Sequence, residues 1–119
     1  LIIFTFVFKM NNKLRQYYLK KLKKAHAFWS YDQLKINTLS DEVLIENVFI
    51  HLDMDDIILL FRHFPRNIIK KVWLERLVRQ EPMFHNLNNM IALLFFNIKN
   101  PERYLAISKQ KILKSLSLC

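Results

Sequence analysis

Residues 39–63, with the sequence LSDEVLIENVFIHLDMDDIILLFRH, contain the two clearest helix starts of this 119-residue chain. Ser40 can accept a hydrogen bond from the first turn of a helix over residues 41–51, and two acidic residues follow it in that turn. The same arrangement recurs at Asp53, which is expected to cap a second helix over residues 54–63. An apolar residue precedes each cap and can pack against the helix it starts. The stretch therefore predicts two short helices joined by a tight turn.

Four further segments have helical patterning. An amphipathic, lysine-rich helix is predicted from residue 12 to about residue 29, with its apolar residues on a narrow stripe. Pro65 suits the first turn of another helix. A fifth helix is expected to start near Pro82 and is apolar on all sides from residue 90 to residue 96, so it is either the buried centre of the fold or an interface, with the core favoured. A sixth starts near Asn100.

The predicted fold class is therefore all-α, a compact bundle of five to six short helices in one helical domain over residues 10–119. Composition agrees, because the chain has no glycine where average usage of about 7% predicts roughly eight. Tight β-hairpins and phosphate-binding loops depend on glycine, so strand-rich and nucleotide-binding folds are disfavoured. We expect no cofactor.

The chain termini give two further expectations. Residues 1–8, LIIFTFVF, are too short to span a bilayer as a helix, which needs about 20 residues, and their positive charge follows the apolar run, unlike a secretory signal. We therefore expect residues 1–9 to be non-native upstream sequence or a disordered extension, with the native chain starting at Met10. Cys119 is the only cysteine and can close no disulfide within the chain, so a cytoplasmic location is expected.

Charge is segregated along the chain. Residues 1–31 hold seven Lys or Arg and no acid, residues 32–60 hold seven acids and one Lys, and residues 61–119 hold eleven Lys or Arg and three acids, which gives +7, −6 and +8 and sums to +9. Most of the acids in the middle block fall at the two predicted helix starts, where they favour helix formation locally. The basic blocks have no such local explanation and are the better candidates for partner contacts.

Two basic helix faces supply the candidate contact residues. On the first helix the lysines lie opposite the apolar stripe, and Tyr17 or Tyr18 could stack on unpaired bases, whereas a simply solvated lysine face is an equally good interpretation. On the fourth helix a basic face could hold a phosphate backbone, although a solvated face is favoured there. The candidate nucleic-acid or partner contacts are Lys13, Lys20, Lys23, Lys24, Arg66, Lys70 and Lys71.

No residue pattern indicates catalysis or metal binding. The acidic run at residues 53–56 lacks the glycine and the distal glutamate of a calcium loop, and its aspartates suit a helix start. The four histidines are dispersed and match no zinc spacing. No catalytic, cofactor-binding or metal-ligating residue is therefore assigned, and we expect a protein that is not an enzyme.

Four segments together resemble a known type of domain. They are FWSYD at residues 28–32, LSDEVLIE at 39–46, VWLERLV at 72–78 and FFNIKNPERYL at 95–105. The chain resembles a small helical bacterial domain of unknown function that is found beside nucleotidyltransferase toxins of the AbiEii type. The resemblance implies an accessory or antitoxin-like role in a toxin–antitoxin or defence operon, with the toxin as a possible partner, and it transfers no catalytic residue.

Two functional hypotheses follow. The first is an antitoxin-like protein-interaction module, which docks a partner through its acidic block or its basic surfaces. The second is a basic nucleic-acid-binding module that contacts the phosphate backbone of DNA or RNA. The sequence leaves the oligomeric state and the identity of the partner open, and predicts no membrane span.

Overall fold

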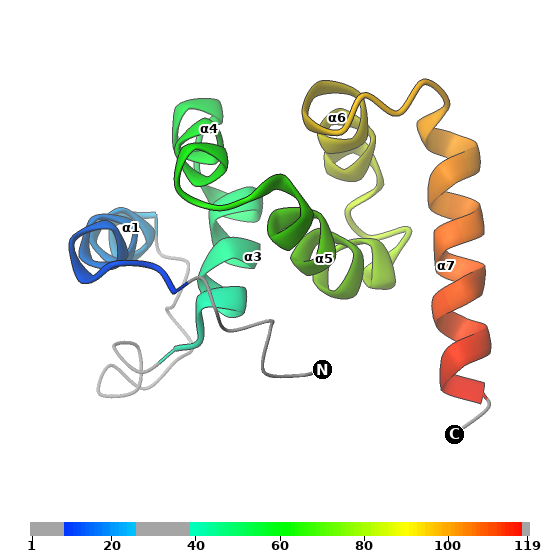
Figure 1. The fold of residues 1–119 in the computed structure, drawn as a ribbon, viewed down its shortest axis with the longest axis horizontal. Helices are drawn as coiled ribbons and strands as arrows, with labels where there is room; N and C mark the ends of the chain where they lie inside the picture. Colours follow the sequence, from blue (N-terminus) through cyan, green and yellow to red (C-terminus); the bar gives the residue numbers. More distant parts are fainter. Residues whose placement is uncertain (1–8, 26–38, 118–119) are drawn as a thin grey trace. The chain divides into compact units, whose positions relative to one another are not determined.

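The computed structural model describes residues 9–25 and 39–117, and within these ranges it contains α-helices, one short 3-10 helix and no strand (Figure 1). The predicted all-α class with five to six short helices is confirmed. The elements are α1 (Asn12–Lys24), α3 (Asp41–His51), α4 (Met54–His63), α5 (Arg66–Arg76), the 3-10 helix η2 (Val78–Gln80), α6 (His85–Phe95) and α7 (Pro101–Ser117).

The chain divides into two compact units, residues 1–69 and residues 70–119. The first contains α1, α3 and α4, and the second contains η2, α6 and α7, with the division falling within α5. Each unit is described by itself below. The expected single domain over residues 10–119 stays a prediction, and the expectation for residues 1–9 falls almost wholly outside the described residues.

Helix α1 starts at the predicted residue and ends earlier than predicted. The Asn11 side chain caps its start by accepting the Leu14 backbone N–H at 2.8 Å. The helix ends at Lys24, where the backbone N–H of Ala25 donates to the Lys21 carbonyl, so the predicted end near residue 29 is wrong. Lysines in the last turn favour a helix end there, because the helix dipole is negative at that end. Ala25 is exposed, although the predicted apolar stripe included it.

Helices α3 and α4 have the predicted bounds, and one of the two predicted caps is present. The Ser40 hydroxyl accepts the Val43 backbone N–H at 3.3 Å. Asp53 occupies the capping position of α4, but its side chain makes no capping hydrogen bond, so that detail of the prediction is wrong. The Asp53 backbone carbonyl instead accepts the N–H groups of Asp56 and Ile57, which satisfies these first-turn donors.

The first unit has a core formed by the apolar stripe of α1 and the inner faces of α3 and α4. Packing between α1 and α3 buries side chains to below 2% exposure, and this removal of apolar surface from water is the main stabilising contribution. The fully buried residues from these helices include Tyr18, Leu19, Leu22, Leu44, Ile45, Val48, Phe49 and Leu60.

The second unit is built around Trp73, which is fully buried. Its ring stacks with Phe96 at 5.1 Å between centroids and lies parallel to Tyr104 at 6.2 Å. Its indole N–H donates to the Asn88 side-chain oxygen at 2.9 Å. Trp73 therefore joins α5 to α6 and α7 by ring contacts and by one buried hydrogen bond.

Helix α6 differs from the predicted fifth helix. It starts at His85 rather than near Pro82, and its expected buried character holds for one side only. Ile91 and Ala92 are fully buried, whereas Leu93 and Leu94 are 50% and 61% exposed. The helix ends where Asn97 adopts a positive φ of 54°, a conformation that asparagine tolerates better than most residues.

Candidate binding surfaces

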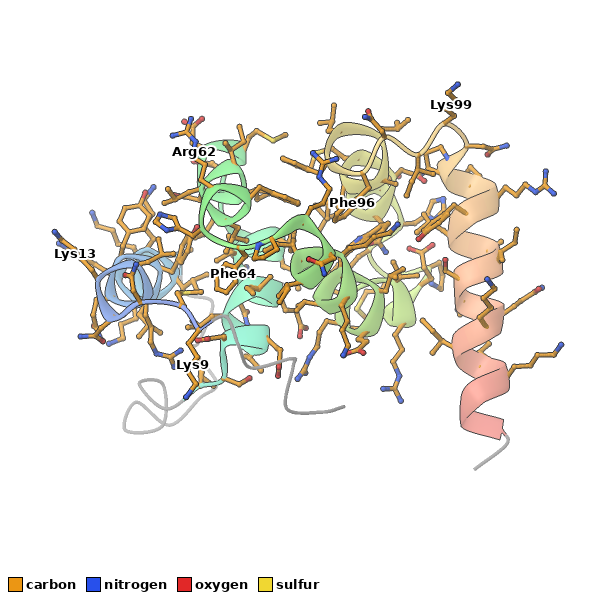
Figure 2. All side chains as sticks on the ribbon, viewed as in Figure 1. Lys9, Lys13, Arg62, Phe64, Phe96 and Lys99 are labelled. Atoms are coloured by element: carbon orange, nitrogen blue, oxygen red, sulfur yellow. The ribbon has the colours of Figure 1, made fainter. Side chains whose placement is uncertain are left out.

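The lysines predicted on the first helix form one exposed surface on α1. At about 100° per residue, Lys13, Lys20 and Lys24 fall on one side of the helix and Lys23 lies at its edge. All four side chains are exposed, and none forms an ion pair or hydrogen bond with another described residue. Lys13 projects away from α1 (Figure 2). We call these four residues the α1 lysine face.

The orientation of this face is fixed by two other basic residues of α1: Arg15 on the opposite side of the helix, and Lys21 beside Tyr17 at the border of the face. Arg15 Nη1 lies 2.9 Å from Asp41 Oδ1 of α3, and the Arg15 side chain also donates to the Leu39 carbonyl. Lys21 Nζ lies 3.0 Å from Asp56 Oδ2 of α4. These two ion pairs and the buried apolar stripe hold the α1 lysine face toward solvent.

Asp41 and Asp56 were interpreted from the sequence as helix-start residues, and the structure gives both a second role. Asp41 Oδ2 accepts the Met10 backbone N–H at 2.9 Å in addition to binding Arg15. Asp56 is buried, with 2% of its surface exposed, and accepts the Tyr17 hydroxyl at 2.7 Å. Both carboxylates therefore connect helices that are distant in sequence.

Of the two tyrosines that were candidates for base stacking, only Tyr17 is exposed. Tyr18 is fully buried, and its hydroxyl donates to the Asp56 backbone carbonyl at 2.8 Å, so it cannot reach a ligand. Burial, and then the Asp56 charge, raise the pKa of Tyr18. Tyr17 is 40% exposed. The Lys21 pKa is raised by the hydrogen bond to Tyr17 and then by Asp56, so this lysine is charged.

The basic residues of α5 do not form a uniform face. Arg66 and Lys71 are exposed, as expected for contact residues. Lys70 is half-buried, and its ammonium lies 5.4 Å from the ring centroid of Tyr104 and 5.8 Å from that of Phe96. Figure 2 shows Phe96, which follows α6, within the second unit. The aromatic rings attract the Lys70 charge, so its role as a partner contact is less favourable than that of Arg66 or Lys71.

A polar network that the sequence did not reveal joins the start of α6 to α7. His85 Nδ1 lies 2.5 Å from Glu81 Oε1, and His85 Nε2 lies 2.8 Å from Glu102 Oε1. Hydrogen bonds to Glu81 and then to Glu102 raise the His85 pKa. Asn88 donates to the second Glu81 oxygen at 2.6 Å, and Asn89 donates to Glu102 at 2.9 Å. Contacts of this kind link residues up to seventeen positions apart and leave no periodic signal in the sequence.

This network has a structural role, because His85 bridges Glu81, before α6, and Glu102 of α7. Each ring nitrogen of His85 faces a carboxylate, so the charged imidazole is stabilised on both sides.

Over residues 9–25 and 39–117, no group of three or more His, Cys, Asp or Glu residues is arranged to hold a metal ion. None of the helices in that part of the chain is both long and apolar enough to cross a bilayer.

The exposed pair Leu93 and Leu94 forms the most distinct apolar feature of α6. The pair follows directly after buried Ile91 and Ala92, so both the inner and the outer side of the last turns are apolar. Ile98 N–H donates to the Ala92 carbonyl at 3.0 Å, which brings the chain after α6 back against this end of the helix. The next charged residue along the chain is the exposed Lys99, labelled in Figure 2.

Comparisons with protein-family models, with curated proteins and with solved structures give no match to this sequence.

Proposed function

We propose that this chain is a non-enzymatic, antitoxin-like interaction module that docks a partner protein of a bacterial toxin–antitoxin or defence operon. The observation that best supports the proposal is the exposure of Leu93 and Leu94, at 50% and 61%, on a helix whose other side is buried. Adjacent exposed leucines are typical of surfaces that become buried in a complex. The resemblance of residues 28–105 to domains found beside nucleotidyltransferase toxins suggests such a toxin as the partner.

The charged residues near the leucine pair indicate which kind of partner surface would fit it. Lys99 and Arg103 follow the leucine pair and are exposed, and Glu102 between them is engaged by His85 and Asn89. An apolar contact next to uncompensated positive charge fits a partner whose own apolar residues are flanked by acids.

Co-expression with the products of adjacent genes tests the proposal. We expect one of them to co-purify with the chain in a defined stoichiometry. The double variant Leu93→Ser/Leu94→Ser should abolish co-purification, because a small buried cluster supplies most of the binding energy of an interface. Met83→Ser is the matched control, since Met83 is 72% exposed and lies before α6. A chain that stays alone and monomeric with every adjacent product would contradict the proposal.

A second function, nucleic-acid binding, is favoured by the α1 lysine face. Its four ammonium groups are exposed and unpaired among the described residues, whereas Arg15 and Lys21 on the same helix are engaged with carboxylates. Lysines that neutralise phosphates release counterions, so the affinity should fall with salt by a log–log slope of about 0.7 to 0.9 for each phosphate contacted.

Titration of labelled oligonucleotides at several salt concentrations tests this second function. Replacing Lys13, Lys20, Lys23 and Lys24 by alanine should reduce the slope by about 3 if all four contact phosphates. A matched control replaces Lys99 and Lys111 by alanine, since both are exposed lysines of the second unit. If neither DNA nor RNA binds at low salt, the second function is refuted.

A further inference from the structure

Tyr17 is an aromatic side chain held in one orientation at the border of the α1 lysine face. Its hydroxyl donates to Asp56 Oδ1 at 2.7 Å, and Asp56 itself is buried. Lys21 Nζ lies 5.1 Å from the Tyr17 ring centroid and is held there by Asp56 at 3.0 Å. The buried Tyr18 ring contacts Tyr17 edge to face at 5.5 Å. Three neighbours therefore fix the ring, yet 40% of Tyr17 remains exposed.

The lysines near Tyr17 follow helical spacing. Lys13 is four residues before it and Lys20 is three residues after it, so each lies one turn away on the same side of α1, at about 5–6 Å between Cβ atoms. Lys24 lies one turn beyond Lys20. The exposed ring is thus adjacent to a row of unpaired ammonium groups. Among the described residues, the one buried carboxylate near the ring is bound to Lys21 and does not neutralise that row.

We infer that Tyr17 is a stacking platform for an unpaired base, and that the partner of the α1 lysine face is single-stranded nucleic acid. The inference rests on the second proposed function and adds the class of nucleic acid to it. Lysines alone contact phosphates of any nucleic acid, because every nucleotide carries a phosphate whatever its sequence or strand form. A fixed, exposed aromatic ring beside them needs a base whose face is free, and such bases occur in single strands, loops and ends.

Ring fixation also lowers the cost of stacking. A tyrosine that moved freely would lose side-chain entropy when a base stacked on it, whereas this ring is already ordered by Asp56, Lys21 and Tyr18. The hydroxyl is satisfied inside the protein, so binding does not require a new partner for it. Because Lys21 lies over one face of the ring, the base would stack on the other face, and 40% of the Tyr17 residue is exposed for this contact.

The test compares four ligands at low salt by fluorescence anisotropy: a short single strand, the same strand with abasic sites, the corresponding duplex, and anionic phosphatidylserine vesicles. We expect the intact strand to bind tightest. Tyr17→Leu should weaken its binding by about 5- to 150-fold, the range measured for the loss of one stacked base, and should leave binding of the abasic strand and the salt slope unchanged. Tyr17→Phe keeps the ring and should retain most of the affinity.

Each contrary outcome is specific. If intact and abasic strands bind equally to the unmodified protein, the stacking inference is overturned while nucleic-acid binding stands; this comparison needs no variant and is independent of folding defects. A duplex that binds as tightly as the single strand overturns it as well. If no oligonucleotide binds, or if the vesicles alone bind, both the inference and the second function fail. Circular dichroism of the Tyr17 variants provides the control for folding.

Discussion

Replacing Asn88 by alanine should destabilise the protein far more than the same change at its neighbour Asn89. Asn88 is fully buried in α6, where its oxygen accepts the Trp73 indole N–H at 2.9 Å and its amide donates to Glu81 at 2.6 Å and to the Leu77 carbonyl at 3.3 Å. Asn89 is half-buried; its amide nitrogen makes one exposed hydrogen bond, to Glu102, and its buried oxygen has no partner among the described residues.

The expected loss follows from which groups find another partner. The Leu77 carbonyl keeps the Gln80 N–H at 3.1 Å, and Glu81 keeps His85. The Trp73 N–H lies in a fully buried ring and would be left unpaired, which costs about 1–3 kcal/mol. Removal of the buried amide also leaves a small cavity. The total is about 3 kcal/mol for Asn88→Ala.

The two alanine variants form a matched pair, because both replace asparagine by alanine within the same helix and gain the same helix propensity. Their difference in free energy of unfolding, measured by urea titration with circular dichroism, therefore compares the loss of the buried Asn88 amide with the loss of Asn89, whose side-chain oxygen is buried and unpaired among the described residues. We expect a difference of about 2–3 kcal/mol. A difference below about 0.5 kcal/mol, within the usual error of additivity, would refute the structural role assigned to Asn88.

Two further predictions concern ionisable groups. The pKa of His85 is raised in the folded protein, so its contribution to stability should be fully present below its ordinary pKa of 6.5 and should be lost as the pH rises through the raised value. The variant His85→Gln should remove this pH dependence of stability. An NMR titration that gives a His85 pKa at or below 6.5 would contradict the prediction. Asp56→Ala should destabilise by about 1–2 kcal/mol, since it removes the acceptor of the Tyr17 hydroxyl and of Lys21, two partly exposed groups that water can partly satisfy. Asp56→Asn should cost less because its oxygen still accepts Tyr17, and equal losses in denaturant titrations would argue against this hydrogen bond.

Local interactions explain why much of the fold was predictable from the sequence. The bounds of α3 and α4 follow from residues at or next to their starts, and the Ser40 cap acts over three residues. The inward stripe of α1 follows from helical periodicity, and Leu14, Tyr18 and Leu22 are buried as it predicts. Capping and periodicity are properties of neighbouring residues, so one sequence suffices to detect them.

The contacts of the candidate surfaces were less predictable, because they depend on residues far apart in the chain. Helical periodicity places Lys70 on a polar face, and only the packing of Phe96 and Tyr104 brings their rings to its ammonium. The hydrogen bond between Trp73 and Asn88 could have been suspected from the sequence. A buried tryptophan needs an acceptor for its indole N–H, and Asn88 is a polar residue next to an apolar run. The exposure of Leu93 had none, because an entirely apolar run does not show which side faces the core.

The charge segregation that the sequence shows has a structural explanation in part. Two acids of the middle block, Asp41 and Asp56, pair with Arg15 and Lys21 of the first block, so opposite charges from adjacent blocks meet inside the first unit. The basic residues of α1 therefore divide into two groups with different roles. Arg15 and Lys21 form ion pairs that hold the helix against α3 and α4, and the α1 lysine face remains unneutralised by the described residues. This unneutralised positive charge repels itself, and binding of the negatively charged partner proposed above would relieve that repulsion.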